Sequence, residues 1–156
     1  MKKILFDFTL NVQNVAFERK NLDISNLDLD NLKGIANGKM YIFFEPQRKY
    51  IKLETGIIDY LLQLKNVIEE IQTGNYTPFS VSCDWYSNSL KYDFENNSGI
   101  LIIKETNENL FEIKTKFKIF QKSFIKFYEK VLLDLEIYYP ELLHNDVYSN
   151  LKNQLK

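Results

Sequence analysis

The beginning of the chain alternates between apolar and polar residues. From position 4 to position 12 every even position is apolar, and the polar residues Asp7, Thr9 and Asn11 stand between them. The apolar set consists of Ile4, Phe6, Phe8, Leu10 and Val12. A period of two is typical of a strand with one buried face, so we predict a first strand here.

Two segments follow before the first long helical pattern. Residues 21–31 place leucine and isoleucine between Asp and Asn residues, whose side chains compete with the helical backbone for hydrogen bonds. We interpret this segment as a second strand or an ordered loop. Residues 40–44, with the sequence MYIFF, favour a strand that is closed by Pro46.

A helical period begins after Thr55, which is a plausible N-cap. Until Gly74 the apolar residues recur at steps of three and four, at Ile57, Tyr60, Leu61, Leu64, Val67, Ile68 and Ile71. This spacing forms one apolar stripe on a helix, and glycine commonly ends a helix. We therefore predict a helix over residues 56–73.

Between residues 79 and 117 the period of two returns. Residues 79–85 and 90–95 alternate on either side of a Ser-Asn-Ser turn, which is the pattern of a β-hairpin. Two more alternating or apolar segments, residues 100–103 and 111–117, follow after turns that contain Asn. The sequence therefore predicts four antiparallel strands in a meander.

From about residue 121 the pattern becomes helical again. One stripe carries Phe124, Phe127, Tyr128, Val131, Leu132, Leu135 and Tyr138. Pro140 suits the first turn of a further short helix, because proline lacks the N–H group that the first turn leaves unused. We predict a second long helix and a short C-terminal helix.

These patterns together predict an α+β fold. An antiparallel sheet with helices packed on one face satisfies strands that have one dry face and helices that have one apolar stripe. We expect a sheet of about five to six strands, two main helices on one face and the short C-terminal helix. The 156 residues suit one domain, residues 1–156, and no linker or repeat divides them.

Composition and charge limit the function. The net charge of -1 provides no overall field that would draw the protein to nucleic acid or to an anionic membrane. Cys83 is the only cysteine, so an internal disulfide is excluded, and one cysteine with one histidine cannot form a structural zinc site. The basic and apolar beginning of the chain is like that of a signal peptide, but Asp7 interrupts the apolar run. We expect a cytoplasmic protein without a cofactor.

The sequence contains few of the motifs that are typical of enzymes. The sequence contains no glycine-rich phosphate loop and no nucleophile elbow. A cysteine hydrolase would require Cys83 to pair with His144, oriented by Asn145 or Asp146, but Cys83 lies on the apolar side of a predicted strand. The carboxylates of the hairpin could act as a general acid and base, but their positions are also those of a solvent-exposed strand face. We therefore expect no enzymatic activity.

Charged residues gather on two predicted surfaces. Lysines recur at every second position of the last strand and at every fourth position of the second long helix: Lys114, Lys116, Lys118, Lys122, Lys126 and Lys130. They form a solvated face or a docking stripe for an acidic partner. The hairpin carries Asp84, Asp93 and Glu95 on its polar side, with Trp85 and Tyr86 near its turn.

Several segments in this order resemble small bacterial immunity proteins that are encoded beside polymorphic or contact-dependent toxins. The resemblance spans residues 27–136 and rests on LDLDNLKG (27–34), GKMYIFF (38–44), IKLE (51–54), FSVSCDWY (79–86) and FIKF (124–127). It implies a cytoplasmic protein that binds the C-terminal domain of a cognate toxin and blocks it without catalysis. The segment after Pro140 lies outside the resemblance and caps the core or mediates self-association.

The sequence thus leads to one main hypothesis and one alternative. In the first, the polar face of the hairpin binds the toxin domain through Asp84, Tyr86, Lys91, Asp93 and Glu95. In the second, the chain is a small intracellular adaptor or regulatory subunit that binds an acidic partner through the lysine stripe. Neither hypothesis requires nucleic acid, a membrane or a metal, and the sequence leaves the oligomeric state open.

Overall fold

The computed structural model describes residues 4–45, 47–82, 89–105 and 112–153. In chain order its elements are β1 (Ile4–Leu10), α1 (Val12–Asn21), the 3-10 helix η1 (Ile24–Asn26), α2 (Leu29–Leu32), β2 (Asn37–Phe44), β3 (Lys49–Gly56), α3 (Ile57–Gln72), β4 (Phe79–Ser82), β5 (Ser89–Glu95), β6 (Ile100–Glu105), β7 (Glu112–Lys116), α4 (Phe117–Tyr138), the 3-10 helix η2 (Pro140–His144) and α5 (Asp146–Asn153). The fold class is α+β, as predicted.

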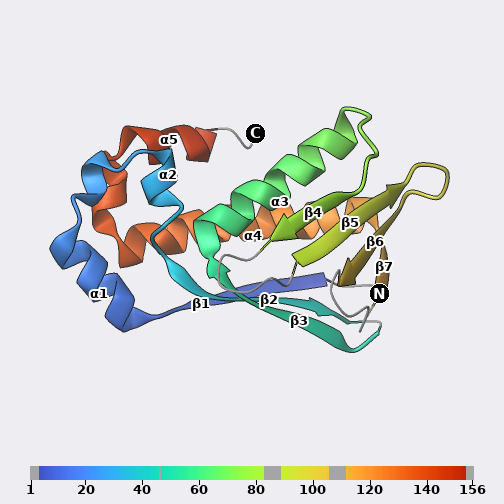
Figure 1. Cartoon of the computed structure of the whole chain (residues 1–156), viewed down its shortest axis with the longest axis horizontal. Coiled ribbons are helices and arrows are strands. Elements are labelled where there is room, and N and C mark those ends of the chain that lie inside the picture. Colours follow the sequence, from blue (N-terminus) through green and yellow to red (C-terminus); the bar gives the residue numbers. More distant parts are fainter. Residues whose placement is uncertain (1–3, 46, 83–88, 106–111, 154–156) are drawn as a thin grey trace.

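The described strands form two antiparallel sheets, so the prediction of one sheet with five to six strands was wrong. The first sheet has the order β1-β2-β3, and the second is the predicted meander β4-β5-β6-β7. Alternation along a strand indicates its buried face, but it does not indicate which strand edges pair. Here α3 begins directly after β3 and carries the chain from the first sheet to the second (Figure 1).

Three local predictions need correction. Helix α1 was missed because its apolar residues form no stripe, and Val15 and Glu18 are its only buried residues. Residues 21–31 contain η1 and the start of α2 instead of a strand. Thr55 is not an N-cap, because it is a fully buried residue of β3 and the cap position of α3 is Gly56. The strand β3 was also not predicted.

Helix α4 connects the two sheets through aromatic side chains. It runs along the molecule behind the strands (Figure 1), and it contacts β1 and β7. The Phe6 ring of β1 lies 5.5 Å from Phe120 and 5.2 Å from Phe127, while Tyr92 of β5 lies 5.9 Å from Phe120. Aromatic pairs at these distances contribute more than their buried area alone. The predicted apolar stripe of this helix is therefore buried in the core, except for Tyr138, which is 38% exposed.

The segment after Pro140 caps the core, which is one of the two roles expected for it. Asn145 is 1% exposed, and its amide nitrogen donates to the carbonyls of Ile24 at 2.7 Å and Leu27 at 3.0 Å. Its side-chain oxygen accepts from the backbone N–H of Tyr148 at 2.9 Å. One polar side chain thus joins η1 to the beginning of α5.

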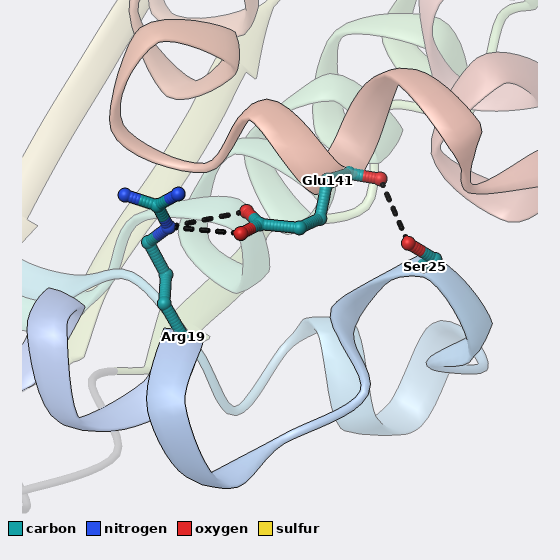
Figure 2. A network of polar contacts seen from close by, with 3 residues as sticks. All are labelled: Arg19, Ser25 and Glu141. Carbon is teal, nitrogen blue, oxygen red and sulfur yellow. Dashed lines mark hydrogen bonds and ion pairs between the residues drawn. The ribbon is translucent and has the colours of Figure 1, made fainter.

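A second set of polar contacts fixes the same end of the molecule (Figure 2). The Arg19 Nε of α1 donates to both carboxylate oxygens of Glu141, at 3.0 and 3.2 Å. The Ser25 hydroxyl donates to the backbone carbonyl of Glu141 at 3.5 Å. Residues more than a hundred positions apart are therefore held together, and α1, α2 and α5 gather at one end (Figure 1).

Candidate functional site

The predicted toxin-binding residues that the structure describes share one face of the second sheet. Lys91 and Glu95 are exposed and Asp93 is half-buried, and all three alternate with core residues along β5. Asp84 and Tyr86 lie outside the described residues, so their position relative to this face stays a prediction. We call this surface the outer face of the second sheet, because the apolar residues of β5 are directed to the core on the other side.

Neighbouring strands extend this outer face with apolar and charged residues. In the register of the sheet Asp93 pairs with Ile102, which pairs with Lys114. Glu95 pairs with Ile100. Isoleucine thus lies at the centre of the face, and charged side chains flank it on both sides. A centre that is less charged than its rim is the common anatomy of protein interfaces.

The described residues of the candidate cysteine site do not form a catalytic arrangement. Cys83 lies outside the described residues, while His144 is exposed at the end of η2. Asn145 directs both polar atoms of its side chain to Ile24, Leu27 and Tyr148, so it does not orient His144.

The lysine stripe divides into two groups. Lys114 and Lys116 are exposed on β7, on the outer face of the second sheet. The lysines of α4 instead line a groove of about 790 Å³ between this helix and the beginning of β1. Its lining consists of Ile4, Leu5, Phe6, Lys118, Ile119, Lys122, Ser123, Lys126, Phe127 and Lys130. We call it the β1–α4 groove.

A second hollow of about 330 Å³ continues the groove along the same two elements. It shares Lys130 with the first, and it adds Asp7 and Phe8 of β1 and Asp134, Ile137 and Tyr138 of α4, so this end of the groove carries carboxylates as well as a lysine. Ile137 is 76% exposed and Leu5, at the other end, is 53% exposed. The floor therefore offers apolar contacts along its length, and lysines line one wall.

The open edge of β1 forms the other wall. Among the described strands β1 pairs only with β2, and the bond from the Asn11 N–H to the Asn37 carbonyl continues their register. In an antiparallel pair the hydrogen-bonded residues alternate, so the odd residues of β1 bond to β2. The N–H and carbonyl groups of Ile4, Phe6 and Phe8 are consequently directed to the open edge.

Asp7 covers part of this edge. Its carboxylate accepts a hydrogen bond from the backbone N–H of Phe8 at 2.8 Å, and it lies 3.9 Å from the Lys130 ammonium. Among the described residues this is the only ion pair that involves the lysines of the groove. A charged residue at an open strand edge is a common protection against unwanted strand pairing.

A carboxyl group with a raised pKa lies outside the groove, at Glu18 of α1. The Tyr139 hydroxyl donates to the Glu18 Oε1 at 2.7 Å, and the two side chains are 0% and 9% exposed respectively. Burial raises the pKa of the Glu18 carboxyl, and the hydrogen bonds from Tyr139 and from the Ala36 backbone partly oppose this increase. Burial and the neighbouring Glu18 also raise the pKa of the Tyr139 hydroxyl. The pair joins α1 to the end of α4 and is structural.

Comparisons with protein-family models, curated proteins and solved structures found no significant match. Within the described ranges no three His, Cys, Asp or Glu side chains are placed to hold a metal ion. None of the described helices combines the length and the apolar character that crossing a bilayer requires. The groove was missed from the sequence because it depends on how α4 lies beside β1, although the lysine spacing on α4 was a visible signal.

Proposed function

We propose that this chain is a non-enzymatic, cytoplasmic protein that binds the C-terminal domain of a bacterial toxin and neutralises it. Two observations support the proposal. The sequence resembles immunity proteins, and the outer face of the second sheet offers a surface for a protein partner. The second observation carries more weight, because it concerns side chains whose positions are known.

The outer face has the composition that a stable protein interface needs. Lys91 and Glu95 are exposed and carry opposite charges, while the half-buried Ile100 of the neighbouring strand provides apolar area; Ile102 is only 6% exposed and provides little. Charges at an interface rim set the orientation and the rate of association, and the apolar centre contributes most of the affinity. Specific complexes bury about 1,600 Å² in total, so a toxin domain would also contact neighbouring surfaces.

Binding to a candidate toxin domain, taken from a gene next to the one that encodes this chain, tests the proposal. Titration calorimetry would compare the unaltered protein with the double variant Lys91→Glu, Glu95→Lys, which reverses two exposed charges and keeps the net charge. Because like charges then face each other across the interface, we expect the dissociation constant to rise roughly tenfold or more.

The matched control is Lys52→Glu, Glu54→Lys, which makes the same exchange on β3 of the first sheet. It should bind like the unaltered protein. If both double variants bind the toxin domain equally well, the outer face of the second sheet is not the contact surface. If no toxin domain binds to the folded protein, the proposed function itself is wrong.

The β1–α4 groove favours a second candidate function. A small adaptor or regulatory subunit that binds an acidic partner would use the lysines of this groove, of which Lys118, Lys122 and Lys126 form no ion pair with a described carboxylate. The two functions differ in their response to charge reversal, because an adaptor would lose its partner when the lysines of α4 are changed and would be insensitive to Lys91→Glu, Glu95→Lys.

A further inference from the structure

The β1–α4 groove has two features that its role in the fold leaves unexplained. First, the N–H and carbonyl groups of Phe6 are directed to the open edge of β1, and among the described residues only Asp7 covers this edge, at Phe8. Second, the lysines of α4 stand four residues apart on one side of the helix, and like charges at this spacing destabilise a helix. A strand edge and a row of cations thus meet in one open groove.

We propose that the β1–α4 groove binds an extended acidic segment of a partner protein, which adds to the first sheet as a strand beside β1. The backbone of the segment would exchange hydrogen bonds with Phe6 and its neighbours, and acidic side chains on one face would meet the lysines of α4. This surface is separate from the outer face of the second sheet, so the inference stands whether or not that face binds a toxin domain.

The spacing of the two elements fits this arrangement. Side chains on one face of a strand repeat about every 6.8 Å, and residues four apart on a helix repeat about every 6.0 Å. Ring contacts from Phe6 to Phe120 and from Phe8 to Phe127 show that β1 and α4 run in the same direction. Both lead toward the end that holds α1 and α5 (Figure 1). Alternate acidic residues would therefore stay within reach of successive lysines.

Charge argues against a second copy of this chain as the occupant. Pairing of β1 with β1 of another copy would bring two sets of lysines from α4 toward the same groove. Like charges brought together in this way oppose association. An acidic segment instead neutralises Lys118, Lys122 and Lys126, whose described surroundings contain no carboxylate partner. The groove therefore selects a different chain with negative charge.

Fluorescence anisotropy with synthetic peptides tests the inference. The probe is a labelled peptide as long as β1 in which glutamate and valine alternate, and it should bind with an affinity that falls as salt is added. Two N-methylated versions block the backbone, one at every glutamate and one at every valine. Only one set of N–H groups faces β1 in a paired strand. We therefore expect one version to bind at least tenfold more weakly than the other.

Protein variants test the two walls separately. An exposed ion pair contributes about two- to threefold to an equilibrium constant, and reversal adds repulsion, so Lys122→Glu, Lys126→Glu should weaken peptide binding about tenfold or more. The matched control Lys49→Glu, Lys52→Glu makes the same charge change on β3, the opposite edge strand of the first sheet, and should have little effect. Asp7→Ala frees the Phe8 N–H and Lys130, and it should strengthen binding.

Each remaining outcome would overturn the inference. If both N-methylated peptides bind as well as the unmodified one, or if a single-stranded oligonucleotide of equal charge binds as tightly, the groove is a general polyanion site and not a strand-pairing site. If the folded protein does not bind the peptide, or if sedimentation shows that the groove is occupied by a second copy, the proposed occupant is wrong. These outcomes leave the toxin proposal intact, because the charge exchange at Lys91 and Glu95 tests that proposal.

Discussion

Asn145→Ala should destabilise the protein more than any other single deletion of a polar side chain at this end of the molecule. The side chain makes hydrogen bonds of 2.7, 3.0 and 2.9 Å with Ile24, Leu27 and Tyr148, and the residue is 1% exposed. Each buried bond contributes about 1 kcal/mol net, and groups left without a partner add to the loss. We expect the free energy of unfolding to fall by about 3 to 5 kcal/mol.

Urea denaturation followed by circular dichroism measures this loss. A chain of this size should also melt roughly 6 to 20 °C lower. The matched control is Asn150→Ala, which removes an exposed side chain of the same type from α5 and should change the stability by no more than about 0.5 kcal/mol. Equal stability of the two variants would refute the role assigned to Asn145.

Asn145→Asp distinguishes lost hydrogen bonds from lost volume. The carboxylate keeps an acceptor for the Tyr148 N–H, but it replaces the donor that faces the carbonyls of Ile24 and Leu27. At neutral pH this variant should be at least as unstable as Asn145→Ala, because a buried charge then faces two carbonyl oxygens. At low pH the protonated acid donates again, so its deficit relative to the unaltered protein should shrink.

Two further substitutions test the strand contact and the buried acid. A Cβ atom at Gly38 would lie 2.0 Å from the Thr9 carbonyl oxygen, so Gly38→Ala should destabilise the protein by more than about 3 kcal/mol in thermal unfolding. The control is Gly34→Ala, where the nearest atom lies at 3.3 Å, and it should cost less than about 1 kcal/mol. Burial raises the pKa of Glu18 in the folded state, so this group stabilises the fold fully below its unfolded value near 4.5 and loses that contribution as pH rises through the folded pKa. The stability of Glu18→Gln relative to the unaltered protein should therefore rise as the pH is raised from 4.5 to neutral. If the difference in unfolding free energy between the two proteins is independent of pH, the raised pKa of Glu18 is not the cause.

Much of the fold could be predicted because local patterns determine it. The alternation from Ile4 to Val12 and the stripe that ends before Gly74 correspond to β1 and α3, except that β1 ends at Leu10 and the exposed Val12 begins α1. The meander was also predicted, because its strands pair with their neighbours in the chain. Helix α4 begins at Phe117, a few residues earlier than its pattern indicated, because Phe117 also fits the alternation of the preceding strand.

The parts that were missed depend on contacts between distant residues. Lys49–Gly56 was not predicted as a strand, although its apolar residues alternate, and Ile51 and Leu53 pair with Ile42 and Met40 of β2. Sheet membership follows from such pairings and not from periodicity. The same limit applies to the β1–α4 groove, because the sequence shows a row of lysines without showing the strand edge beside it.

The central claim is that this chain neutralises a toxin domain by binding it, and a titration of toxin activity tests it most directly. The activity of a purified candidate toxin domain, taken from a gene next to the one that encodes this chain, would be measured while the chain is added in increasing amounts. The account predicts a linear fall that reaches zero near one equivalent, because each bound copy blocks one toxin domain. Full toxin activity in the presence of excess folded chain, or complete loss at a small fraction of an equivalent, would contradict stoichiometric and non-enzymatic neutralisation.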